Sequence, residues 1–204
     1  MKIDKKRILI VGAHPDDLEF GLAGSLHKLI KDNQIKIEVF STSVNINGNE
    51  ILDEMKKSMA NLQISDYCVS ETARTMEFFK YEDVIKQRLF ELKQSFIPDI
   101  IFSTSTRSLN SDHKVLGECV LNVFQEQMII FYETLRGDHK LNPNLYSVLS
   151  SDDLMVKLEL LELYGTQTHR DYMKPDVINT LARYRGSQIG HTYAEAFEVE
   201  RMII

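Results

Sequence analysis

Residues 7–40 read RILIVGAHPDDLEFGLAGSLHKLIKDNQIKIEVF, and this stretch determines the fold class. Its first six residues form an apolar, β-favouring run that ends at a glycine, which is typical of a buried strand. After the polar segment 14–17, apolar residues recur at helical spacing, at Leu18, Leu22, Leu26, Leu29 and Ile30. Residues 36–40 favour a second strand. A strand, a polar loop, a helix and a strand in this order predict a βαβ unit and therefore a parallel sheet.

The same alternation continues along the rest of the chain. Apolar spacing predicts helices over residues 50–62, 81–96, 114–127, 152–164 and 175–185, and strands over 67–69, 99–104, 128–132, 145–149 and 196–204. No linker, repeat or low-complexity stretch interrupts the pattern. We therefore expect residues 1–204 to form one α/β domain, a Rossmann-like three-layer sandwich with a mostly parallel sheet.

Composition narrows the class of protein further. The 204 residues carry 24 Lys and Arg against 30 Asp and Glu, and the formal net charge of −6 argues against a nucleic-acid binder. Cys68 and Cys119 are too few and too isolated for a disulfide framework or a CxxC zinc module. No apolar run reaches the length of a membrane span, so a soluble, cytoplasmic protein is expected. The sequence leaves the oligomeric state open, a homo-oligomer included.

A first polar cluster, His14, Asp16 and Asp17, follows the first expected strand. In open parallel sheets, ligands bind beyond the carboxyl ends of the strands. The loop lacks the glycine patterns GxGxxG and GxxxxGK[ST], so nucleotide binding is unsupported. One aspartate could cap the following helix. A cap does not explain two aspartates and an imidazole on one turn.

A second cluster, residues 110–113 (NSDH), follows the expected strand 99–104. Taken alone it could be a helix cap made by Ser111 or Asp112. Because both clusters end strands of one sheet, the two loops can converge on one site. Imidazoles with a carboxylate suit Zn²⁺, with Fe²⁺ as the alternative, and three protein ligands leave a position for water. Such a site can hydrolyse an amide, with one aspartate as ligand and its neighbour taking a proton from the water.

The motifs in these clusters resemble those of a known family. Residues 13–19 (AHPDDLE), followed by Gly21 and by GSL at 24–26, resemble the AHPDD signature of the LmbE/PIG-L family. Asp112-His113 resembles its HxDH motif, and residues 184–197 (YRGSQIGHTYAEAF) are similar to its C-terminal segment. The resemblance runs from Ile8 to about Phe197. It implies a zinc-dependent N-deacetylase that acts on N-acetylglucosamine or related amino sugars.

The resemblance also implies a role for individual residues. His14, Asp17 and His113 match the ligands of one zinc ion per chain, and Asp16 matches the general base. Asn110 departs from the family, because it stands where HxDH has its first histidine. An asparagine can donate a hydrogen bond to an oxyanion, but it cannot act as a general acid. The acid role would then fall to Asp16 after protonation or to another residue.

Several side chains are candidates for that missing role or for substrate binding. Those considered for the missing role are Arg74, His169, His191 and Tyr193. Those expected to bind substrate are Arg74, Arg185, His191 and Tyr193. Glu19, the acidic residue after the first motif, is expected to support the loop.

The main functional hypothesis is zinc-dependent hydrolysis of an N-acetyl group from an amino sugar or sugar conjugate, nucleotide- or glycan-linked, with release of acetate. One alternative is a related amide hydrolase acting on an N-formyl group or a thiol conjugate with the same metal centre. The other is a metal- or sugar-binding protein without turnover, indicated only by Asn110. The intact pair Asp16 and Asp17 favours an enzyme, because a binding protein has no need of the spare carboxylate.

Overall fold

A computed structural model describes residues 3–41, 48–70, 72–135, 137–138 and 140–203. Its strands are β1 (Arg7–Gly12), β2 (Gln34–Val39), β3 (Tyr67–Val69), β4 (Ile100–Ser103), β5 (Met128–Tyr132), β6 (Leu145–Leu149) and β7 (Tyr193–Arg201). They form a seven-stranded sheet in the order β3-β2-β1-β4-β5-β7-β6. The first five pair in parallel, whereas β7 is antiparallel to both β5 and β6. The expected mostly parallel sheet is confirmed, although the last strand begins at Tyr193 rather than at residue 196.

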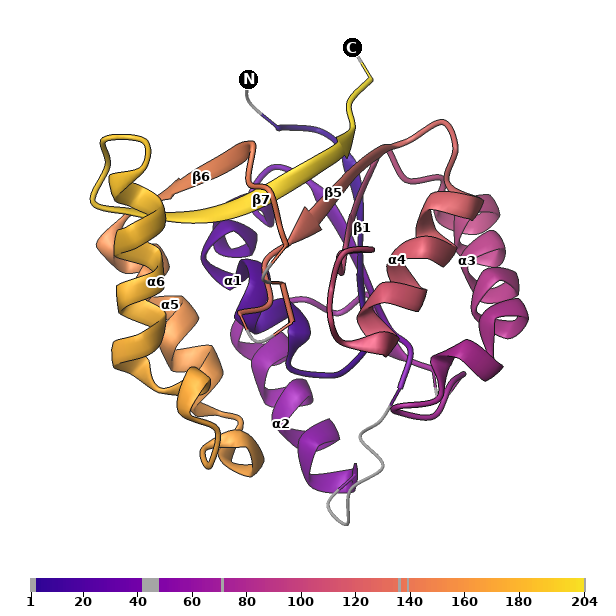
Figure 1. The fold of residues 1–204 in the computed structure, drawn as a ribbon, viewed down its shortest axis with the longest axis horizontal. Coiled ribbons are helices and arrows are strands. Elements are labelled where there is room, and N and C mark those ends of the chain that lie inside the picture. The colour runs from indigo at the N-terminus through magenta and orange to yellow at the C-terminus, as the bar shows by residue number, and fades with distance from the viewer. Residues whose placement is uncertain (1–2, 42–47, 71, 136, 139, 204) are drawn as a thin grey trace.

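Helices cover both faces of the sheet. They are α1 (Asp17–Leu29), α2 (Gly48–Asn61), α3 (Glu82–Phe96), α4 (Ser111–Val123), α5 (Ser151–Glu162) and α6 (Pro175–Ser187), with short 3-10 turns η1 (Phe78–Lys80), η2 (Gly165–Gln167) and η3 (Asp171–Met173). Helices α3 and α4 lie on one side of the sheet, and α1, α2, α5 and α6 lie on the other (Figure 1). Within the described ranges, none of the helices has the length and apolar character needed to cross a membrane.

The side chains of β1 divide the core into two layers. Ile8 and Ile10 belong to the apolar cluster formed with α1, α2 and α5, whereas Leu9 and Val11 belong to the cluster formed with α3 and α4. All four side chains are buried, and each such burial contributes about 1.5–3 kcal/mol. Because successive side chains of a strand point to opposite faces, one continuous apolar run can hold both helical layers.

A buried ion pair ties the C-terminal strand to the first helix. Glu195 of β7 accepts hydrogen bonds from the backbone N–H groups of Gly24 (3.1 Å) and Ser25 (2.7 Å) in α1. The Lys157 ammonium of α5 lies 2.7 Å from the same carboxylate. Both charged side chains are buried, so removing either partner would leave an uncompensated charge. Residues 193–197 (YAEAF), at the start of β7, therefore anchor α1, the helix that begins with Asp17.

Strand order brings the two polar clusters to one place. The chain moves outward from β1 to β2 and β3, and then returns to β4 on the other side of β1. The loops after β1 and β4 consequently diverge at a switch point, where α/β sheets form their ligand crevice. Helix α4 approaches this edge closely, since a Cβ added at Gly117 would lie only 2.7 Å from the carbonyl oxygen of Thr104.

Candidate metal centre

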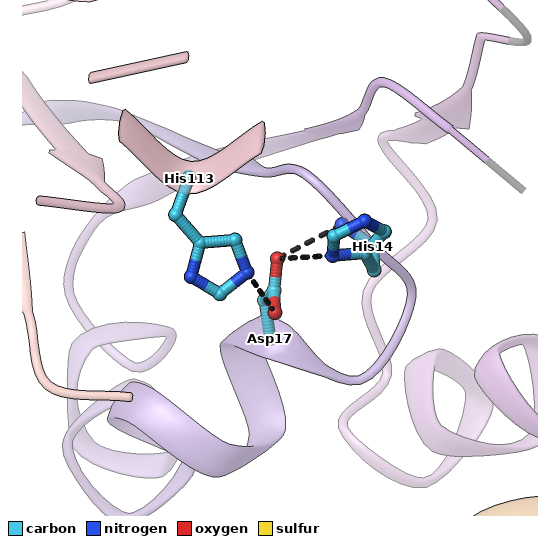
Figure 2. Close-up of side chains that lie close together, drawn as sticks. All are labelled: His14, Asp17 and His113. Carbon is cyan, nitrogen blue, oxygen red and sulfur yellow. Dashed lines mark hydrogen bonds and ion pairs between the residues drawn. The ribbon is translucent and has the colours of Figure 1, made fainter. Parts of the chain in front are cut away.

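Three side chains from the two loops meet at the switch point (Figure 2). His14 lies in the loop after β1, Asp17 is the first residue of α1, and His113 lies in the first turn of α4. Each offers one ligand atom, and these atoms all lie within 4.8 Å of one another. The structure thus brings together the three residues that the sequence predicted as metal ligands.

The backbone of the loop fixes the Asp17 carboxylate. Its Oδ2 accepts hydrogen bonds from the N–H groups of Ala13 (2.9 Å) and His14 (2.8 Å), and its Oδ1 lies 3.1 Å from Nε2 of His113. Burial opposes ionisation, but the adjacent imidazoles outweigh it and hold the pKa of Asp17 well below its usual range. Asp17 is therefore a charged, immobilised carboxylate rather than a side-chain cap of α1.

A hydrogen-bond chain sets the tautomer of His113. The Thr134 hydroxyl donates its single hydrogen to Oδ2 of Asp138 (2.7 Å), so its oxygen accepts from Nδ1–H of His113 at 3.3 Å. Nε2 is then the nitrogen that faces the cluster and is left to bind a metal. This buried Nε2 makes no well-aligned hydrogen bond, although it lies close to Asp17. Nitrogen and oxygen atoms that lie close together but are not aligned for a hydrogen bond can ligate one cation together. The three residues therefore fit a metal ion.

Asp112 contacts the His14 imidazole on the nitrogen that faces away from Asp17. Its Oδ2 lies 3.2 Å from Nε2 of His14, and its two oxygens also accept from the N–H groups of Met76 (2.5 Å) and Phe78 (3.3 Å). Burial would lower the pKa of His14, but its hydrogen bonds to Asp112 and Asp17 raise it to about 10. A site that stabilises an imidazolium so strongly is one that attracts positive charge. The sequence marked Asp112 only as a motif residue or a cap and missed this contact.

Asp16 lies beside the ligands without joining them. Asp16 lines the cavity that lies over the three ligands, and its Oδ2 is 3.5 Å from Nη1 of Arg170. Burial and the negative charge of Asp17 raise the pKa of Asp16, although His14 and Arg170 oppose the rise. A carboxylate whose ionised form is disfavoured accepts a proton readily, as a general base must.

Asn110 caps helix α4 and also lines the cavity over the cluster. Its Oδ1 accepts from the N–H groups of Asp112 (2.9 Å) and His113 (3.4 Å), so Asn110 is the N-cap of α4. The cap expected of Ser111 or Asp112 is therefore made by the residue before them. Asn110 also lines the cavity, and with Oδ1 engaged by the backbone its NH₂ group is the hydrogen-bond donor.

The cavity over the cluster has a volume of about 530 Å³, within the range of small-molecule sites. Its walls combine the polar cluster with apolar side chains, including Phe20, Ile51, Leu135 and Met173. A lining of both polar and apolar side chains suits a ligand with a polar reactive end.

The residues predicted to bind substrate do not line this cavity. Arg185 forms a two-pronged ion pair with Glu133 instead. Arg74 is exposed, although its neighbours Thr75 and Met76 do line the cavity. His191 and His169 are exposed, and Tyr193 is half-buried at the start of β7.

Three other polar residues, all from the segment between α5 and α6, occupy the wall instead. These are Gln167, Arg170 and Tyr172, and no motif in the sequence identifies them. Glu19 is buried in the first turn of α1. Its Oε1 accepts from the hydroxyls of Ser58 (2.6 Å) and Tyr164 (2.8 Å).

The fold and the cluster define an α/β protein with a candidate metal site at the switch point of its sheet. A family profile described as PIG-L, GlcNAc-PI de-N-acetylase, matches residues 9–124, more than half of the chain. The chain belongs to this family and is accordingly a hydrolase of the deacetylase class.

Solved structures share the fold. N,N'-diacetylchitobiose deacetylase from Pyrococcus horikoshii superposes with a TM-score of 0.80 at 20% identity, covering 96% of this chain and 84% of that one. A zinc-inhibited form of teicoplanin deacetylase Orf2 gives 0.75 at 9% identity, with coverages of 97% and 100%. GalB, the 4-carboxy-2-hydroxymuconate hydratase from Pseudomonas putida KT2440, gives 0.75 at 13%, with coverages of 98% and 98%. The same fold thus occurs in deacetylases and in a hydratase, so the residues of the site must decide the chemistry.

Proposed function

We propose that this protein is a zinc-dependent N-deacetylase that removes the acetyl group from an amino sugar or a sugar conjugate. The observation that carries the proposal is the convergence of His14, Asp17 and His113 beside a spare carboxylate, Asp16, in a cavity of about 530 Å³. A purely structural zinc site would have four protein ligands, whereas this cluster offers three and leaves the Asp16 carboxylate beside them.

Each residue of the site has a task in amide hydrolysis. His14, Asp17 and His113 would hold a zinc ion, which would supply Lewis acidity toward the amide carbonyl and the attacking water. Asp16 takes the proton of the attacking water, a task suited to its raised pKa. The Asn110 NH₂ group donates a hydrogen bond to the carbonyl oxygen as negative charge develops on it. Because asparagine carries no transferable proton, Asp16 also returns the proton to the departing amine.

The shape of the cavity is consistent with an N-acetyl sugar. A volume of about 530 Å³ accommodates one sugar ring with its substituents and part of an aglycone. The apolar lining residues Phe20 and Met173 are available for contact with the less polar face of the ring and with the acetyl methyl group. This arrangement also favours an acyl group over a free amine at the reacting position.

Acetate release tests the proposal directly. Purified protein loaded with zinc is incubated with a panel of N-acetylated sugars and glycosides, and acetate and free amine are measured together. Wild-type protein should release both in equal amounts, whereas Asp16→Asn, with its zinc retained, should be nearly inactive. Zinc-loaded wild-type protein that releases no acetate from any member would contradict the proposal. Addition of water to an unsaturated carboxylic acid would point instead to hydratase chemistry.

A further inference from the structure

The wall of the cavity next to Asp16 contains a guanidinium group that the proposed reaction does not use. Arg170 is the only lysine or arginine among the described residues that line the cavity. Its side chain is 30% exposed, so part of the group is open to a ligand. It lies between η2 and η3, in a segment outside the motifs of the metal centre.

Arg170 is held differently from the arginines that have structural roles in this protein. Arg88 donates from Nε to one oxygen of the buried Glu38 and from Nη2 to the other, each at 2.9 Å. Arg185 forms the same two-pronged pair with Glu133. Arg170 contacts Asp16 through one nitrogen at 3.5 Å and makes no two-pronged pair within the described residues. The planar fork that suits a carboxylate or phosphate is therefore not filled by the protein.

Neighbouring groups hold the guanidinium in place. Its Nη1 donates to the Tyr172 hydroxyl at 2.6 Å, and its centre lies 5.9 Å from the centroid of the Tyr172 ring. The Tyr172 ring in turn packs edge-on against Phe20 of α1, with centroids 5.9 Å apart. A preorganised arginine loses less conformational entropy when it binds an anion.

The same wall has a second unsatisfied polar group. The Gln167 side chain lines the cavity and is 7% exposed, and its amide donates to Thr166 Oγ1 at 3.0 Å. Its buried Oε1 has no hydrogen-bond partner among the described residues. Leaving a buried acceptor unpaired costs about 1–3 kcal/mol, and a donor on a bound molecule would recover that cost.

We infer that Arg170 is a specificity-determining residue that binds an anionic group of the substrate, a carboxylate or a phosphate carried beside the N-acetyl sugar. Gln167 accepts a hydrogen bond from a hydroxyl next to that group. This inference rests on the proposed deacetylase function, and it narrows the substrate class to acidic sugar conjugates. Arg170 lies between the substrate anion and Asp16, where its charge compensates both.

The test compares three substrates and two variants of the zinc-loaded protein. The substrates are N-acetylglucosamine 1-phosphate, the carboxymethyl glycoside of N-acetylglucosamine and the uncharged methyl glycoside. Arg170→Gln removes the guanidinium, and Arg183→Gln removes an equal charge from an exposed position on α6, outside the cavity. We expect Arg170→Gln to raise KM for the charged substrates by about 10- to 100-fold, the size of lost charge-assisted hydrogen bonds. Because Arg170 also contacts Asp16, any change in kcat should be shared by all three substrates, whereas KM for the uncharged methyl glycoside should not rise with KM for the charged ones. Arg183→Gln should resemble the wild type.

The two charged substrates distinguish a phosphate site from a carboxylate site, because the larger increase in KM identifies the preferred group. An equal fall of kcat on all three substrates, with no selective rise of KM for the charged ones, would overturn the inference and make Arg170 a positioning residue for Asp16. No change on any substrate would overturn it too. Equilibrium binding of N-acetylglucosamine 1-phosphate gives a separate measurement. If wild-type protein releases no acetate at all, the proposed function fails, yet weaker binding by Arg170→Gln alone still supports the anion site.

Discussion

Replacing Thr134 by valine should weaken zinc binding without touching a ligand. The hydroxyl of Thr134 accepts from Nδ1–H of His113 at 3.3 Å and donates to Asp138 at 2.7 Å. Valine has nearly the same shape, so the cavity around the residue should stay filled. The imidazole, however, loses the partner that fixes its orientation and its tautomer.

The magnitude follows from what the substitution leaves unpaired. Thr134 is only 7% exposed, so water does not readily replace the lost hydroxyl. Nδ1 of His113 then lacks its acceptor, and Asp138 keeps the backbone N–H of Thr134 at 2.6 Å but loses the O–H donor. Loss of such a supporting partner typically weakens metal binding about 10- to 100-fold, which corresponds to about 1.4–2.7 kcal/mol. The free energy of unfolding of the metal-free protein should also fall, by about 1–3 kcal/mol.

Competition with a chromogenic chelator would measure the dissociation constant for zinc, and denaturant unfolding would measure stability. Thr134→Ser keeps the hydroxyl and should bind zinc nearly as the wild type does. A valine variant with unchanged zinc affinity would refute the assignment of the His113 tautomer. Equal weakening in the serine and valine variants would indicate disturbed packing in place of a lost hydrogen bond.

Three further predictions concern the same centre. Asp16→Asn should keep its zinc and lose about 10²- to 10⁴-fold in kcat, because the amide cannot accept the proton; loss of zinc on elemental analysis would instead make Asp16 a ligand. Asn110→Ala should lower kcat about 10²-fold through loss of the oxyanion donor and also reduce the melting temperature through loss of the α4 cap; unchanged kcat would leave Asn110 as a cap alone. Zinc affinity should rise about tenfold per unit between roughly pH 6 and pH 8, because the pKa of His14 without metal is raised to about 10 and zinc must displace that proton; a plateau above about pH 6.5 in calorimetric titrations would show an ordinary pKa for His14.

The main elements of the fold were predictable because their signals are local. The apolar run of β1 and the helical spacing after Asp17 depend only on neighbouring residues, so strand and helix could be assigned from residues 7–40. The ends of the helices and strands were predicted less accurately than their order. Helix α4 begins at Ser111, not at residue 114, because the Asn110 side chain caps it and includes the motif in its first turn. Strand β7 begins at Tyr193, where pairing with Leu149 of β6 extends it.

The expected metal ligands could be named from the sequence because two of them, His14 and Asp17, are three residues apart and the third lies in a recognisable motif. The residues around them could not. Asp112 meets His14 across 98 positions of the chain, Thr134 meets His113 across 21, and Arg170 reaches Asp16 from beyond α5. None of these contacts has a local sequence pattern.

The sequence by itself determined the succession of strands and helices, the two polar loops and the residues expected to hold the metal. Only the tertiary structure decided which other side chains surround that centre. It assigned Arg185 to an ion pair with Glu133, left His191 exposed, and placed Arg170 in the cavity. The physical reason is that local structure follows from the conformational preferences of adjacent residues, whereas the walls of the cavity follow from sheet order and from helix packing across the switch point. Those depend on burial of apolar surface contributed by the whole chain.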